Sequence, residues 1–373
     1  MRRFVGLFIL AFVFLVGCNG TKNTTDNTVP NEGNGTVSSG VQTNTPAPTE
    51  TPVPTATSTP TPTPTLTPTP APTATPTPTP TPDVEAPVLT LLGESTVEVI
   101  ARSEYVEPGF TAIDNVDGDI TELVQVSGEI DVNWCDTYTL TYEVTDQAGN
   151  QGKIERTVIV KQPDVIVPEG KVIYLTFDDG PGRYTDQVLE ILDKYDIKAT
   201  FFTCINGWPA KVTEIHEKGH TVAIHCKSHN YNVIYASEEA YFDDLFTMQD
   251  LVYECTGVRQ TLVRFPGGSS NASSKFNPGI MTRLTEKLKK MGFQYIDWNA
   301  SSEDSFLTDK QAMFDEMIPS ILKTNCAVVL LHSETNEHSV NMLEEFILWG
   351  FENGYRYLPM DTTSPRAQHR VWN

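Results

Sequence analysis

The chain has 373 residues and a formal net charge of −22 at pH 7. Basic and acidic residues balance up to Pro82, so the excess acid lies in the remainder of the chain. Such a surface repels phosphate backbones and anionic lipid headgroups, so we expect no nucleic-acid partner. The six cysteines show no CxxC spacing, which excludes zinc-ribbon and dithiol redox classes. The length leaves room for two domains with tails, and we expect a monomer.

The N-terminus has the pattern of an export signal. Arg2 and Arg3 precede an apolar run over residues 4–16 that is short for a membrane span. Leu15-Val16-Gly17-Cys18 resembles the bacterial lipobox, in which the signal is cut before the cysteine and that cysteine is lipidated. An ordinary secretory signal with a coincidental cysteine is the alternative. We therefore expect a lipoprotein signal over residues 1–18 and a lipid anchor at Cys18, on the outer face of a bacterial membrane.

A tether follows over residues 19–82. Residues 19–41 are polar and without periodicity, and residues 45–82 are a near-repeat of threonine and proline. Alternating proline fixes φ and removes hydrogen-bond donors, so we expect polyproline II rather than helix or sheet. At about 3.1 Å per residue this stretch reaches roughly 120 Å, enough to carry the following domains into a cell wall. A proline-rich ligand for a recognition domain is the alternative.

Residues 83–162 have the pattern of a small all-β domain. The segment 137–144 alternates threonine and glutamate with tyrosine, leucine and valine, which is typical of a half-buried strand. Strands are expected at 88–92, 96–100, 123–126, 137–145 and 155–161, and together they favour an immunoglobulin-type β-sandwich. The segments 105–109, 114–119 and 146–150 resemble the recurrent motifs of bacterial extracellular Ig-like repeats.

The acidic segment 114–119 raises the question of calcium. An EF-hand loop needs oxygen ligands at alternate positions and a glutamate at its twelfth position. Val116 occupies one of the alternate positions, and Gln125 occupies the twelfth when counting starts at Asp114. The spacing therefore fails, and we expect turn chemistry, in which aspartate side chains bond their own backbone. Weak calcium binding remains the alternative.

Residues 165–373 alternate strands with helices. Apolar strands are expected at 172–176, 200–203, 221–224, 262–263, 295–298 and 327–331, and helices at 186–195 and in a segment that ends near Lys218. This alternation predicts an α/β domain with a parallel sheet, closed or nearly closed into a distorted barrel. A polar cluster follows each predicted strand, at the edge where such barrels place their chemistry.

Two of these clusters can form a metal site. Asp178 and Asp179 are adjacent, and such neighbours ionise together only where a positive charge is close, as a divalent metal provides. His225 and His229 are four residues apart, which on a helical turn places both rings on one side. Two imidazoles and a carboxylate leave coordination positions open, as in catalytic metal sites. A chance pairing of packed histidines is the alternative, and the absence of HExxH excludes the metalloprotease class.

Three more clusters, over residues 264–268, 298–304 and 330–332, could complete an active site. Arg264 could pair with Asp178 and lower its pKa. The turn at 266–268 lets backbone approach a ligand, so that its N–H could face a developing oxyanion. His332 ends an apolar strand and, beside an acid such as Asp304, becomes a plausible general acid rather than a core histidine.

In this order and spacing the five clusters resemble the NodB-homology polysaccharide deacetylases, carbohydrate esterase family 4, over residues 171–357. The resemblance implies Asp178 as catalytic base, and Asp179, His225 and His229 as ligands of a divalent metal, usually Zn²⁺, with Co²⁺ or another divalent ion as alternatives. Arg264 matches the arginine that orients the base.

For the remaining clusters, the resemblance implies that the Gly267 N–H helps to form an oxyanion hole. Asp304 matches the acid that tunes the catalytic histidine, His332, and Leu330 matches a leucine of the acetyl pocket. We add Trp298 as an aromatic residue that could stack on a sugar.

Several positions depart from the family pattern. Cys226 stands where the family usually has serine or threonine, and Gly267 where it usually has an aromatic residue. Ser301 stands in place of an aspartate, and Ser305 in place of a tryptophan. None removes a ligand, the base or the acid. The resemblance implies removal of N-acetyl groups from an extracellular glycan, with peptidoglycan N-acetylglucosamine first. Chitin-like or other poly-N-acetylglucosamine, O-acetyl xylan, and a catalytically weak wall-binding protein are the alternatives.

Overall fold

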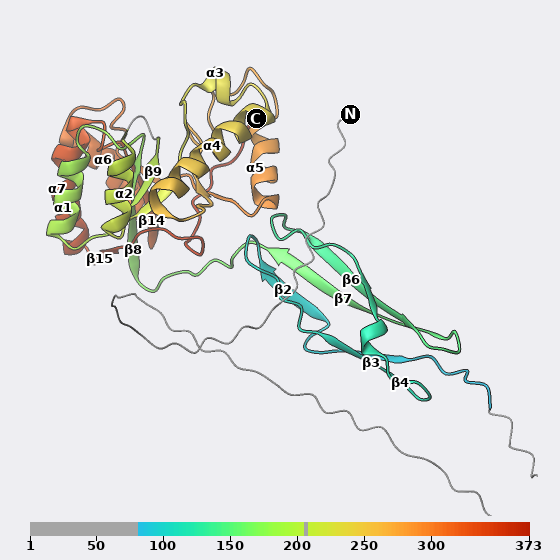
Figure 1. Cartoon of the computed structure of the whole chain (residues 1–373). Helices are drawn as coiled ribbons and strands as arrows, with labels where there is room; N and C mark the ends of the chain where they lie inside the picture. The colour runs from blue at the N-terminus through green and yellow to red at the C-terminus, as the bar shows by residue number, and fades with distance from the viewer. Residues whose placement is uncertain (1–80, 205–207) are drawn as a thin grey trace, which may run out of the picture. The chain divides into compact units, whose positions relative to one another are not determined.

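The computed structural model describes residues 81–204 and 208–373 (Figure 1). The predicted signal, Cys18 and the tether up to residue 80 lie outside the described residues. Among the helices of the described ranges, none combines the length and apolar character needed to cross a membrane.

Residues 88–161 form two small sheets. One sheet has the order β1-β3-β4 and the other β2-β7-β6-β5. The strands are β1 (Val88–Leu91), β2 (Thr96–Ile100), β3 (Phe110–Asp114), β4 (Gly118–Asp119), β5 (Gln125–Ser127), β6 (Thr137–Thr145) and β7 (Gln151–Lys161). In β6 the side chains of Leu140, Tyr142 and Val144 are buried, as the alternating pattern predicted. This arrangement confirms an all-β Ig-like domain.

In this domain the bounds of one predicted strand were wrong, and one strand was missed. The segment 123–126 is not one strand, because a 3₁₀ turn, η1 (Thr121–Leu123), precedes the shorter β5. The strand β3 was not predicted, although Ala112 is fully buried in the core. β3 lies directly between the turn-like segments 105–109 and 114–119, and its last residue, Asp114, belongs to the second of them, so its short apolar pattern did not stand out.

The remaining chain forms one parallel sheet with the order β12-β11-β10-β9-β8-β14-β13 and with β15 also paired to β8. Its strands are β8 (Lys171–Asp178), β9 (Thr200–Thr203), β10 (Thr221–Ile224), β11 (Leu262–Val263), β12 (Gln294–Tyr295), β13 (Ala300–Ser301), β14 (Cys326–Leu331) and β15 (Tyr355–Tyr357). The helices are α1 (Thr185–Lys194), α2 (Pro209–Glu217), α3 (Tyr231–Ile234), α4 (Glu238–Thr256), α5 (Ile280–Lys290), α6 (Lys310–Ile321) and α7 (Glu337–Glu352).

β8 is the centre of this sheet. It pairs with β14 along one edge, while β15 and β9 share its other edge. Every residue of β8 after Lys171 is buried, since helices cover the sheet: α1 and α6 pack beside α7, and α2 packs beside α4 (Figure 1). The carboxyl ends of all these parallel strands therefore meet at one edge.

The fold class, a distorted α/β barrel after a small β-sandwich, is confirmed. The barrel is open, because β12 and β13 end the strand order without pairing to each other within the described residues. The predicted strand 295–298 is shifted to Gln294–Tyr295, and the short β13 was not predicted. Two-residue strands carry too little pattern for sequence analysis to locate their ends.

Candidate active site

The predicted site residues converge at the carboxyl edge of the sheet. Asp178 ends β8, His225 follows β10, Arg264 follows β11 and His332 follows β14. A cleft of about 420 Å³ opens there, lined by Asp178, Asp179, His225, His229, Tyr231, Gly267, Trp298, Ser301, Glu303, Asp304, Ser305, Phe306, Leu330 and His332. Of the site residues predicted from Asp178 onwards, only Arg264 does not line the cleft, because it lies buried behind Asp178.

Asp179, His225 and His229 form a compact donor set. Asp179 Oδ1 lies 3.4 Å from Nε2 of His225 and 3.4 Å from Nε2 of His229. His225 Nδ1 donates to the backbone oxygen of Arg264 at 2.9 Å, which turns Nε2 towards Asp179. The predicted helical turn over 225–229 was wrong, since the segment is a loop and His229 has a left-handed φ of 44°.

The charge balance of this donor set suits a divalent cation. Asp179 Oδ1 is buried and accepts no hydrogen bond from the described residues. Burial alone would lower the pKa of His225, but the charge of Asp178 and the polar contact with Asp179 raise it to about 10. Burial would raise the pKa of Asp179, yet the polar contact with His225 and the charges of His225 and His229 hold it well below its usual range. Two imidazoles and a carboxylate therefore fit zinc or a similar ion.

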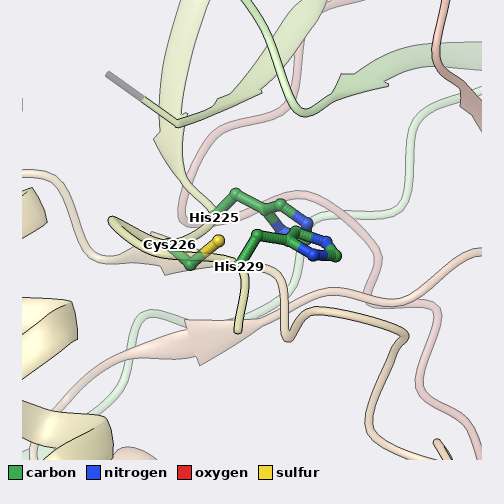
Figure 2. Close-up of side chains that lie close together, drawn as sticks. All are labelled: His225, Cys226 and His229. Atoms are coloured by element: carbon green, nitrogen blue, oxygen red, sulfur yellow. The ribbon is translucent and has the colours of Figure 1, made fainter. Parts of the chain in front are cut away.

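Cys226 is a further possible ligand beside these histidines. Its Sγ lies within 4.8 Å of ligand atoms of His225 and His229. Figure 2 shows both imidazole rings extending in the same direction, away from the sulfur of Cys226. That sulfur contacts Sγ of Cys204 at 3.3 Å, and both are free thiols, as are the other described cysteines. Asp179 is the better third ligand, because one oxygen faces both Nε2 atoms.

Asp178 is held by a buried arginine. Its Oδ1 accepts from Arg264 Nη1 at 2.7 Å, and both side chains are nearly or fully buried. The guanidinium also donates to Thr176 Oγ1 and to the carbonyl oxygens of Ile296 and Asp297. It stacks on the Phe202 ring, with 4.1 Å between Cζ and the ring centroid. This set of contacts fixes the direction in which Asp178 faces the cleft.

Asp304 and His332 form a second oriented pair. His332 Nδ1 donates to Asp304 Oδ1 at 2.7 Å, and the His332 backbone N–H donates to Oδ2 at 2.6 Å. Burial opposes protonation of His332, but the hydrogen bond and charge of Asp304 outweigh it and raise the pKa of His332. The other ring nitrogen, Nε2, lies 4.0 Å from Asp179 Oδ2 and so faces the donor set. His332 can therefore present a proton to the cleft.

Gly267, Leu330 and Trp298 shape the cleft wall. Gly267 has φ +73°, and a Cβ there would lie 3.2 Å from the Tyr231 hydroxyl oxygen, so Tyr231 crowds the space that an aromatic residue at 267 would need. The Gly267 N–H donates to no group within residues 81–204 and 208–373. Leu330 is 6% exposed. Trp298 stands edge-on to His369 and also lines a second hollow.

Glu334 lies next to the site and was missed by sequence analysis. It is fully buried, its Oε1 accepts from Thr185 Oγ1 at 2.8 Å, and a Cβ at Gly180 would overlap its carboxyl group. Burial, together with the nearby Asp178 and Asp179, raises the pKa of Glu334 to about 8. The only sequence signal was Gly180. Its φ is not positive, so the backbone does not require glycine there, and the absence of a side chain instead makes room for Glu334.

Comparisons with known proteins identify two families within this chain. A family described as polysaccharide deacetylase matches residues 166–296, and one described as bacterial surface protein, Ig-like domain, matches residues 89–160. The chain is 37% identical over 139 residues to a peptidoglycan-N-acetylglucosamine deacetylase of Bacillus cereus, covering 36% of this chain and 48% of that protein. It is 32% identical over 189 residues to the peptidoglycan-N-acetylmuramic acid deacetylase PdaC of Bacillus subtilis, covering 48% of this chain and 38% of that protein.

The chain thus spans less than half the length of these two curated relatives. A solved structure, the catalytic domain of a peptidoglycan N-acetylglucosamine deacetylase from Eubacterium rectale, is 45% identical, with a TM-score of 0.55. That match covers 57% of this chain and 98% of the solved one. The chain belongs to the polysaccharide deacetylase family and carries a bacterial surface Ig-like domain ahead of its α/β domain.

Proposed function

We propose that this chain is a metal-dependent hydrolase that removes N-acetyl groups from N-acetylglucosamine units of an extracellular polysaccharide. We propose peptidoglycan as that polysaccharide, because relatives of this chain are named for their action on it. One observation carries the proposal. Asp178 with its buried arginine, the Asp179–His225–His229 donor set and the Asp304–His332 pair all face a single cleft.

The two sides of the cleft would divide the proton transfers of amide hydrolysis. When bound by Asp179, His225 and His229, a divalent metal such as Zn²⁺ supplies a Lewis acid and eases deprotonation of water. Asp178, held by Arg264, accepts the proton of the attacking water. His332, held by Asp304, gives a proton to the departing nitrogen, so that the products are acetate and an amino sugar.

The Gly267 N–H and Leu330 would act on the acetyl group itself. The N–H of Gly267 faces the charge that develops on the acyl oxygen, which a preorganised backbone donor stabilises most in the transition state. Leu330 gives the methyl group an apolar wall. None of these steps requires a covalent nucleophile.

A polymeric substrate is supported by the space beside the cleft. A second hollow of about 530 Å³ shares Trp298, Ser301 and Glu303 with the cleft, so sugars on one side of the reacting unit have room.

The cellular location is part of the same proposal: a lipid anchor at Cys18 and the proline-rich tether would hold the α/β domain outside the cell and within the wall.

The test is acetate release by the purified full chain on three substrates: N-acetylated peptidoglycan, chitopentaose and acetylated xylan. We expect the highest rate on peptidoglycan, loss of release after chelation, and recovery when Zn²⁺ is added. A higher rate on chitopentaose or xylan would reassign the substrate. Release that is unaffected by chelation would overturn the metal-dependent mechanism.

A further inference from the structure

A second group of acidic side chains lies in the Ig-like domain, remote in sequence from the site above. Asp83, Asp114 and Asp146 come from three separate segments: the start of the domain, the end of β3, and the turn between β6 and β7 (Figure 1). Each offers a carboxylate oxygen, and the three oxygens lie within 4.8 Å of one another. Three like charges this close repel one another unless a cation compensates them.

Burial makes this grouping costly. Asp114 is 4% exposed and Asp146 is 7% exposed. Asp114 Oδ1 and Asp83 Oδ2 are buried and accept no hydrogen bond from the described residues. None of the three aspartates forms an ion pair with a lysine or arginine in residues 81–204 and 208–373. Buried carboxylate oxygens without a partner are energetically unfavourable, and a bound cation or another positively polarised group would offset that cost.

Backbone hydrogen bonds hold these side chains in place. Asp114 Oδ2 accepts from the N–H groups of Val116 and Asp117, which leaves Oδ1 free. Asp146 accepts from the backbone and side chain of Asn150. Asp83 Oδ1 accepts from the Glu85 N–H, which leaves Oδ2 free. The turn chemistry predicted for segment 114–119 is therefore present, and it also preorganises an oxygen towards the other two aspartates.

We propose that Asp83, Asp114 and Asp146 bind one Ca²⁺ ion. The donors are all hard carboxylate oxygens, with no imidazole or thiolate among them, which disfavours zinc and the softer transition metals. Calcium accepts irregular geometry and completes its shell with carbonyl oxygens and water, whereas Mg²⁺ demands a near-ideal octahedron. Three carboxylates from segments far apart in the sequence suit the more tolerant ion.

Such an ion would join the entry of the domain to its sheets. Asp83 immediately follows the proline-rich segment in sequence, whereas Asp114 ends β3 of one sheet and Asp146 directly follows β6 of the other. Calcium binding therefore fixes where the chain enters the domain and cross-links the two sheets at that end. This role does not depend on the proposed deacetylase activity.

The experiment uses the full chain with His225→Ala, so that the deacetylase metal site does not contribute, after treatment with a chelator. Isothermal titration with CaCl₂ should show one site, in the range of about 10⁻⁴–10⁻³ M typical of extracellular modules. Asp114→Asn and Asp146→Asn should each weaken binding roughly tenfold or more, since even supporting partners of a metal site are worth 10–100-fold. Asp131→Asn is the matched control, because Asp131 makes the same kind of turn but lies outside the group.

Thermal unfolding supplies a second readout. Without calcium, adding Asp114→Asn to the His225→Ala parent should raise the unfolding temperature, because one of three repelling charges is removed. The amide oxygen of the new side chain still accepts from the N–H groups of Val116 and Asp117. With calcium the order should reverse. No calcium uptake by the parent, or equal weakening by Asp131→Asn, would overturn the site, and equal affinity for MgCl₂ would overturn its assignment to calcium.

Discussion

Replacing Arg264 tests how the proposed base is held. Arg264→Met removes the cation but keeps an unbranched apolar side chain against Phe202. Asp178, 3% exposed, then becomes a buried carboxylate without its charged partner, and the acceptors at Thr176 and two carbonyl groups lose their donors. Removing one member of a buried ion pair typically costs about 3–5 kcal/mol, and we expect a loss of unfolding free energy in this range.

The double variant Arg264→Met/Asp178→Asn separates charge from packing. With both charges removed, the penalty for an unpaired carboxylate disappears, so the double variant should recover roughly half or more of the lost stability. Asp178→Asn alone should cost less than Arg264→Met, because the amide oxygen still accepts from the guanidinium.

The assay is urea unfolding of the metal-free full chain, followed by tryptophan fluorescence. Of the five tryptophans, only Trp134 lies in the Ig-like domain, so the signal reports mainly on the α/β domain. A loss below about 1 kcal/mol for Arg264→Met, the level of an exposed ion pair, would refute the reasoning. Equal losses for the single and double variants would show that packing rather than charge is responsible.

Two further predictions concern titrating groups. Asp304→Asn removes the charge that raises the pKa of His332. The alkaline limb of the pH profile of kcat/KM should therefore move to lower pH. A limb that stays in place would contradict the role of His332 as the general acid. Burial raises the pKa of Glu334 from 4.5 to about 8, so between these pH values the carboxyl is protonated only in the folded state, and the unfolding free energy falls as pH rises. The variant Glu334→Gln has no proton to lose, so its urea midpoint should change less than that of the wild type between about pH 5 and about pH 8, both measured without metal. Equal changes in the two proteins would contradict the raised pKa of Glu334.

Strands with a strong pattern could be predicted from the sequence, and weakly patterned ones could not. The alternation over 137–145 located β6 with the same bounds, and the apolar run at 172–176 located β8. β8 continues to Asp178 because its end pairs with Phe202 of β9, a tertiary contact with no local signal. No local pattern predicted the backbone of His229 either, which is left-handed and lies in a loop instead of the expected helical turn.

The candidate site could be predicted because parallel strands bring their ends to one edge. That rule, with the family resemblance, was enough to group Asp178, His225 and His332. Groups joined only by tertiary packing were missed. Glu334 meets Gly180 through space, and Asp83 joins Asp114 and Asp146 from another segment, so a linear motif such as the EF-hand could not reveal that grouping.

The most direct test of the central claim compares acetate release from N-acetylated peptidoglycan by the wild-type full chain and by Asp178→Asn, both loaded with Zn²⁺ and with metal content measured. The amide keeps the shape of Asp178 and the bond from Arg264 but cannot accept the proton of water. We predict equal metal content and a fall in kcat of about 10²–10⁴-fold, the usual contribution of a general base. Equal release by the two proteins would contradict the account.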